Sequence, residues 1–140
     1  AMARFRDMGV SVVIFGDIYL EDVRQYREER VSRAGMRCEF PLWGTDTREL
    51  AQRAAAREFG AIVTCVDTQQ LDGGFCGRDL DHRFYHDLPR GADPCGENGE
   101  FHTFAFKGPV FRREISFEKG ETVLRDDRFL FCNLLPPGGE

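Results

Sequence analysis

The β-branched run VSVVIF, from Val10 to Phe15, constrains the fold of this chain more than any other feature. A continuous apolar run of this length is typical of a strand buried on both faces. Similar runs follow, with segments of helical spacing between them. In chain order the expected elements are a strand at 10–15, a helix at 20–34 ended by Gly35, a strand at 36–40, a helix opened by Asp46, and a strand at 61–67. This alternation predicts an α/β fold in which a βαβαβ unit forms a parallel sheet with right-handed crossovers.

The pattern changes after Asp67. Glycines recur through 69–78, a short helix is expected within 79–88, and from Glu100 apolar and polar residues alternate as in antiparallel strands, with a turn expected at Lys119–Gly120. We therefore expect two regions packed as one unit. They are an α/β sheet at 1–67 and a β-rich appendage at 68–140.

Bulk properties exclude several classes of protein. The 140 residues fit one domain, and the net charge of −5 disfavours a surface that binds nucleic acid, because such a surface clusters cations against phosphates. No apolar run approaches the roughly 20 residues that a membrane-spanning helix needs, and no secretory leader is evident. A cytoplasmic protein without membrane contact is expected.

The cysteines and histidines raise the question of a metal. Five cysteines without a CxxC pair indicate reduced thiols and argue against a disulfide framework or a zinc ribbon. His82 and His86 would share one face of a helix, and Cys76, Cys95 or His102 could complete a zinc site. Their spacing matches no familiar zinc module, so ordinary surface roles are favoured and no metal ligand is assigned.

Ligands of doubly wound sheets bind beyond the carboxyl ends of the strands, and three phrases of the sequence fall there: GDI at 16–18, PLWG at 41–44 and VDTQQL at 66–71. Gly16 would let a phosphate or ribose approach the backbone, and Asp17 could accept from a hydroxyl or hold a metal. Asp17 as a helix cap is the simpler interpretation. Trp43 could stack on a substrate, although a single tryptophan beside a proline more often closes the edge of a core.

The segment DPCGENGEFHTF at 93–104 holds the richest chemistry. Gly96 and Gly99 loosen a turn that carries the carboxylates of Glu97 and Glu100. Two neighbouring carboxylates can orient an amine, act as a general base or bind Mg²⁺. The alternative is a solvated hairpin tip. His102 could donate to an acyl oxygen if it faces a pocket, or pack if it faces the core.

Taken in order, GDI, PLW, the run from Leu71 to Asp81, GENGEFHTF and GPVF resemble the diphthine–ammonia ligase family of the PP-loop ATP pyrophosphatase, or adenine nucleotide alpha hydrolase, superfamily. The resemblance implies a Rossmann-like sheet and an ATP-dependent ligase, with Mg²⁺, that forms an acyl-adenylate which ammonia then attacks. The residues that match family positions have three implied roles. They are Glu97, Glu100 and His102 in catalysis; Gly16, Asp17 and Trp43 in cofactor binding; and Gly96, Gly99, Thr103 and Arg78 in substrate binding.

One departure from the family is large. The SGGKDS-type loop that cradles ATP phosphates is absent, so a sheet truncated at its N-terminus is expected. The edge of the strand at 10–15 would then be covered by a second copy, as a homodimer, or by a complementing N-terminal segment. The expected substrate is a small-molecule or protein-linked carboxylate. Two alternatives remain open: a non-catalytic module that binds nucleotide or substrate, and a bacterial relative that acts on a different acyl group.

Overall fold

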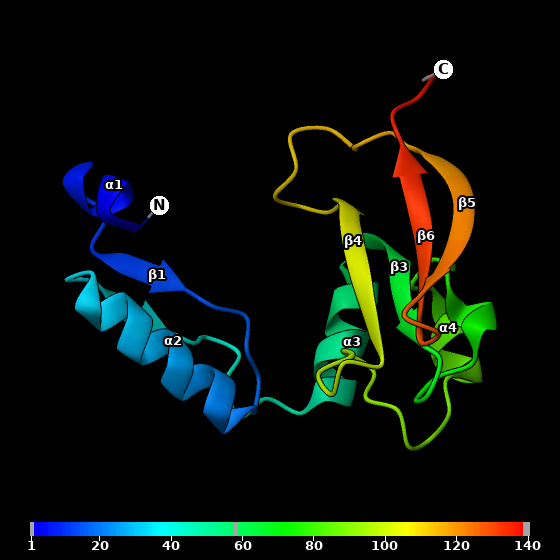
Figure 1. Ribbon diagram of the computed structural model, residues 1–140, viewed down its shortest axis with the longest axis horizontal. Helices are drawn as coiled ribbons and strands as arrows, with labels where there is room; N and C mark the ends of the chain where they lie inside the picture. Colours follow the sequence, from blue (N-terminus) through cyan, green and yellow to red (C-terminus); the bar gives the residue numbers. More distant parts are fainter. Residues whose placement is uncertain (1, 58, 139–140) are drawn as a thin grey trace. The chain divides into compact units, whose positions relative to one another are not determined.

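The computed structural model describes residues 2–57 and 59–138. The chain forms two compact units, Ala1–Asp46 and Thr47–Glu140 (Figure 1). The division falls after Asp46, so the strand expected at 61–67 belongs to the second unit, together with everything that follows it.

The first unit is a small α/β layer. It contains helix α1 (Met2–Asp7), strand β1 (Val12–Ile14), helix α2 (Glu21–Arg33) and strand β2 (Arg37–Glu39). Strands β1 and β2 pair in parallel, with Val13 opposite Cys38, which confirms the parallel pairing expected of the first two runs. Helix α1 was not predicted.

Helix α2 follows the sequence closely. It begins with Glu21 and Asp22 and ends with Arg30 and Arg33 in its last turn, the charge order that the helix dipole favours. Gly35 follows with a φ of +76°, a left-handed conformation that glycine adopts at little cost, and this confirms it as the helix stop.

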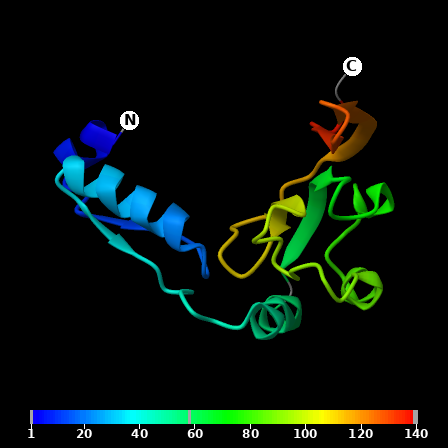
Figure 2. The ribbon, with the colours of Figure 1, turned by 60° about the horizontal axis from the view of Figure 1, so that its bottom comes forward.

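The second unit is built on an antiparallel sheet. Its elements are helix α3 (Thr47–Ala56), strand β3 (Gly60–Asp67), the short 3₁₀ helix η1 (Gly73–Phe75), helix α4 (His82–Asp87), and strands β4 (Phe101–Lys107), β5 (Glu118–Arg125) and β6 (Phe129–Leu135). The strand order is β4-β3-β6-β5, and every pairing in this sheet is antiparallel. Figure 2 shows α3 and α4 below these strands.

The prediction that the strand at 61–67 is the third strand of a parallel sheet is wrong. β3 pairs antiparallel with β4 and β6, so the structure contains a two-stranded parallel sheet and a separate antiparallel sheet. The apolar run at 61–67 indicated burial on both faces, and β3 is buried there. A continuous apolar run is more typical of a parallel sheet, but burial by itself does not reveal which strand lies alongside. A Rossmann-like sheet is therefore not what these strands form.

The expected turn at Lys119–Gly120 is also wrong. Both residues lie inside β5, where Gly120 packs so close to Leu135 that a Cβ would come within 3.2 Å of that side chain. The chain turns instead at Asp126 and Asp127, which have φ values of +53° and +48°. Aspartate tolerates this left-handed conformation better than most residues, and such pairs favour hairpin turns.

The core of the second unit lies between the sheet and the segment that joins β3 to β4. Phe84 of α4 is fully buried and meets Phe75 and Phe101 edge to face, with ring centroids 5.5 and 5.3 Å away. Val63 and Val66 of β3 complete the centre of the cluster. In the described part of the chain, no helix has the length and apolarity needed to cross a bilayer.

Candidate functional site

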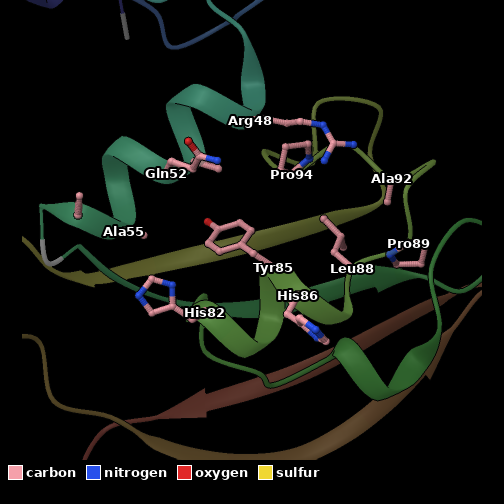
Figure 3. Close-up of a pocket in the computed structure, with 12 residues that line it drawn as sticks. Arg48, Gln52, Ala55, His82, Tyr85, His86, Leu88, Pro89, Ala92 and Pro94 are labelled. Atoms are coloured by element: carbon pink, nitrogen blue, oxygen red, sulfur yellow. The ribbon is translucent and has the colours of Figure 1, made fainter.

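A cavity of about 570 Å³ lies in the second unit, lined by α3, α4 and the segment after α4 (Figure 3). Small-molecule sites commonly have volumes of roughly 300–1,000 Å³. The lining residues are Arg48, Ala51, Gln52, Ala55, Ala56, His82, Tyr85, His86, Leu88, Pro89, Ala92 and Pro94. Figure 3 shows Tyr85 projecting from α4 toward α3, where Gln52 points back toward it.

Local sequence explains why the space is open. The wall formed by α3 carries Ala51, Ala55 and Ala56, whose short side chains leave room opposite Tyr85. The opposite wall is held in place because Asp81 caps α4, accepting from the backbone N–H of Phe84 at 2.8 Å. Small side chains on one helix and an anchored second helix thus create a stable cavity.

The third wall of the cavity is the segment after α4, and it leads into the loop at 93–100. The carboxylates of Asp93 and Glu100 organise this loop through hydrogen bonds. Glu100 is only 3% exposed, and its Oε1 accepts from the backbone N–H of Asp93 at 2.8 Å while its Oε2 accepts from that of Asn98 at 3.1 Å. Asp93 Oδ1 accepts from the backbone of Cys95 and Glu97, at 2.8 and 3.3 Å. For Glu100, the alternative of a solvated hairpin tip is wrong.

This loop is attached to both the sheet and α3. The backbone N–H of Asp67, the last residue of β3, donates to the carbonyl of Glu100 at 2.9 Å, and the thiol of Cys95 donates to the carbonyl of Thr47 at 3.4 Å. Pro94 at its start lines the cavity. Glu100 therefore fixes the position of the cavity's third wall.

Replacing Glu100 with glutamine is expected to destabilise the second unit by about 1–2 kcal/mol, because the new amide would present N–H groups to backbone donors in a buried site. The measurement is chemical denaturation followed by circular dichroism. Glu121→Gln, at an exposed position of β5, is the matched control and should stay within about 0.5 kcal/mol of the parent. Equal effects of the two changes would contradict a structural role for Glu100.

The strongest electrostatic feature was not predicted. Asp67 is 1% exposed, and Arg128 donates two hydrogen bonds to its carboxylate, from Nε at 2.9 Å and from Nη2 at 2.6 Å. Gln70 Nε2 donates to the same carboxylate at 2.8 Å, and the backbone of Gln69 donates at 3.1 Å. The bond to Arg128, then that to Gln70, hold the pKa of Asp67 well below its usual range. An acidic residue ending a buried apolar strand was the available signal, because a buried charge needs a partner.

The other residues predicted near the acidic loop lie apart from the cavity. Glu97 is half-buried on the loop, whereas His102 and Thr103 are exposed on β4. Packing of His102 in the core is therefore ruled out. Arg78 donates to Asp87 at 2.8 Å, and its guanidinium lies 4.9 Å from the centre of the Phe75 ring. None of these side chains is among the cavity's lining residues.

In the first unit, Gly16 and Asp17 follow β1, and Trp43 follows β2. Arg27 donates to both carboxylate oxygens of Asp17, and the guanidinium of Arg24 lies 4.6 Å from the centre of the Trp43 ring. Asp17 is thus engaged by a cation, and Arg24 lies over one face of the Trp43 ring. The cofactor-binding roles that the resemblance implied for Gly16, Asp17 and Trp43 stay predictions.

The cysteine thiols and the candidate metal ligands of the described residues form no second site. Among residues 2–57 and 59–138, no group of three or more His, Cys, Asp or Glu side chains is arranged to hold a metal ion. Cys38, Cys65, Cys76, Cys95 and Cys132 are free thiols. Burial raises the pKa of Cys76 to about 11, with a smaller contribution from Cys132, so this thiol is a poor nucleophile near neutral pH.

The fold and the cavity together define a mixed α/β domain with a pocket of small-molecule size. The family model described as "Diphthamide synthase C-terminal domain" matches residues 46–132, more than half of the chain, and the chain belongs to this family. The matched segment includes every residue that lines the cavity. The family resemblance found in the sequence is confirmed.

Two curated relatives are similar to the chain over most of its length. The diphthine–ammonia ligase of Danio rerio is 30% identical over 127 residues, which cover 86% of this chain and 49% of the relative. The diphthine–ammonia ligase of Bos taurus is 29% identical over 110 residues, covering 74% and 41%. The chain thus spans about half the length of the curated relatives it matches.

Proposed function

We propose that this chain provides the acyl-substrate side of an ATP-dependent, amide-forming ligase of the diphthine–ammonia ligase type. The observation that carries the proposal is the family match at 46–132, which encloses the cavity and the loop that Glu100 organises. In such a reaction a carboxylate displaces pyrophosphate from ATP to give an acyl-adenylate. Ammonia then displaces AMP and leaves the primary amide, with release of a proton.

The described residues supply only part of that chemistry. Asp17 and Trp43 are engaged by arginines, and the described segments contain neither a cluster of metal ligands nor a glycine-rich loop of the SGGKDS type. We therefore assign no step involving ATP or Mg²⁺ to this chain. Those groups would be held by a partner in the cytoplasm, either a complementing N-terminal segment or a second copy. The role left to this chain is to bind and orient the acyl group.

The test is a turnover assay with the full chain, alone and mixed with the part of the Danio rerio relative that it does not match. ATP, Mg²⁺, ammonium and a peptide carrying the diphthine carboxylate are supplied. We expect AMP and pyrophosphate, seen by ³¹P NMR, and the primary amide, seen by mass spectrometry, only in the mixture. The segment of the relative on its own is the control. Without amide formation in the mixture, the ligase proposal fails.

A non-catalytic binding module is the second candidate, and the engagement of Asp17 by Arg27 favours it. The same assay separates the two candidates. Binding of a carboxylate without turnover in the mixture would establish the module. Turnover with another acyl acid but not with diphthine would indicate a relative that acts on a different acyl group.

A further inference from the structure

The chemistry of the cavity lining is unusual for an acidic chain. The chain has a net charge of −5, yet the lining contains no aspartate or glutamate. Its polar members, Arg48, Gln52, His82, Tyr85 and His86, can all donate hydrogen bonds. The rest of the lining is alanine, leucine and proline. A lining of donors and apolar groups is complementary to a ligand with an anionic end and an apolar body.

Arg48 is the permanent cation of this lining, because guanidinium groups stay charged at all accessible pH values. Figure 3 shows its side chain extending from α3 toward the segment that carries Pro94, so its charge lies at the end of the cavity beside the loop held by Glu100. No ion pair of Arg48 is recorded among the described residues. A neighbouring arginine on the same helix, Arg53, pairs instead with Glu49.

Tyr85 supplies a neutral donor at the centre. Burial raises its pKa to about 12, with a smaller contribution from Cys95, so its hydroxyl stays protonated at neutral pH. His86 already contacts the carboxylate of Asp87 through Nδ1 at 3.1 Å, and Arg78 engages that same carboxylate. Arg78, which is not a lining residue, thus compensates the negative charge of Asp87.

We propose that this cavity binds the carboxylate of a small organic acid, with the Arg48 guanidinium as its charge partner and the space between α3 and α4 holding the apolar body. One permanent cation, with the Gln52 amide and the Tyr85 hydroxyl as neutral donors, matches a monoanion better than a phosphate dianion, which usually recruits several cations. The inference rests on the proposed function only for the identity of the natural acid, which would be the acyl substrate.

The experiment is a binding titration of the full chain at pH 7 and constant ionic strength, without ATP, by calorimetry and by NMR of backbone amides. The probes are 3-phenylpropanoate, its uncharged amide 3-phenylpropanamide, and phenyl phosphate. We expect the carboxylate to bind about tenfold more tightly than the amide, which corresponds to about 1.4 kcal/mol. The amide shifts should concentrate in α3, α4 and the segment 88–94.

Two variants separate the role of charge from that of shape. Arg48→Gln should abolish the preference for carboxylate over amide, whereas Arg53→Gln, also exposed on α3, should preserve it. Ala55→Phe should weaken carboxylate and amide alike by filling the apolar part of the cavity. Both arginines are exposed, so neither substitution is expected to prevent folding.

The outcomes that overturn the inference are definite. Equal affinity for carboxylate and amide, tighter binding of phenyl phosphate, absence of binding by every probe, or equal effects of the two arginine variants would each do so. Failure of the turnover assay with carboxylate binding intact would remove the ligase and leave the cavity's ligand class standing. Turnover without carboxylate binding would support the ligase and remove the ligand class proposed for the cavity.

Discussion

Replacing Gly96 with alanine is expected to destabilise the second unit by about 3 kcal/mol, whereas Gly99→Ala should cost about 1 kcal/mol. Both glycines have positive φ, +71° and +83°, so both variants carry backbone strain. A Cβ at Gly96 would also lie 2.7 Å from the carbonyl oxygen of Phe101, while one at Gly99 meets nothing within 4 Å. The measurement is denaturant unfolding followed by circular dichroism.

This pair isolates one steric contact because the two glycines share a loop and a conformation. The contact is with backbone at the start of β4, which cannot move without breaking the pairing between β4 and β3. Indistinguishable free energies of unfolding for the two variants would show that the loop relaxes freely. The inference that the third wall of the cavity is rigid would then be wrong.

Asp67→Asn is expected to lower the Tm of the second unit by about 10 °C, because it removes one charge of a buried pair and leaves Arg128 without its partner. All four groups around the carboxylate are donors, and they belong to Arg128, Gln70 and the backbone of Gln69. An asparagine can accept through one oxygen only. Asp127→Asn, in an exposed turn with positive φ, is the control and should leave Tm nearly unchanged.

The loss of Tm caused by Asp67→Asn should become smaller as the pH is lowered. The pKa of Asp67 is lower in the folded protein than its ordinary value of about 3.9, so its stabilising contribution is complete above that value and is lost as the pH falls toward the folded pKa. The difference in Tm between the parent and Asp67→Asn should therefore shrink as the pH is lowered from about 4 to 2. A difference that stays constant over this range would contradict the assigned ion pair.

Local elements were well predicted where the signal lay within a few residues. Helix α2 ends at Arg33, two residues before Gly35, because glycine readily takes the left-handed conformation required there. Strand β1 is a short apolar run, a helix joins it to β2, and the two strands pair in parallel as expected. The family was also within reach of the sequence, because a resemblance to it can be based on short motifs in order, and the family model matches residues 46–132.

The candidate site was predicted less well, because its parts come from separate segments. Glu100 was predicted to be catalytic, which stays a prediction; in the structure its partners are backbone N–H groups and the Asn98 side chain of its own loop, which makes it an organiser of the cavity wall. Nothing near Arg48 in the sequence indicates that it faces α4, about 35 residues further on. The proposed catalytic roles of Glu97 and His102 stay predictions, as do the substrate-binding roles of Gly96, Gly99, Thr103 and Arg78.

By itself, the sequence determined helix α2 with its stop at Gly35 and the family, since these depend on residue types and spacings along a short stretch of chain. The tertiary structure decided that β3 joins an antiparallel sheet, that Asp67 meets Arg128 across 61 positions, and that α3 and α4 enclose a cavity. The periodicity of apolar residues predicts which side chains are buried. Only packing in three dimensions selects the surfaces and charges that they meet.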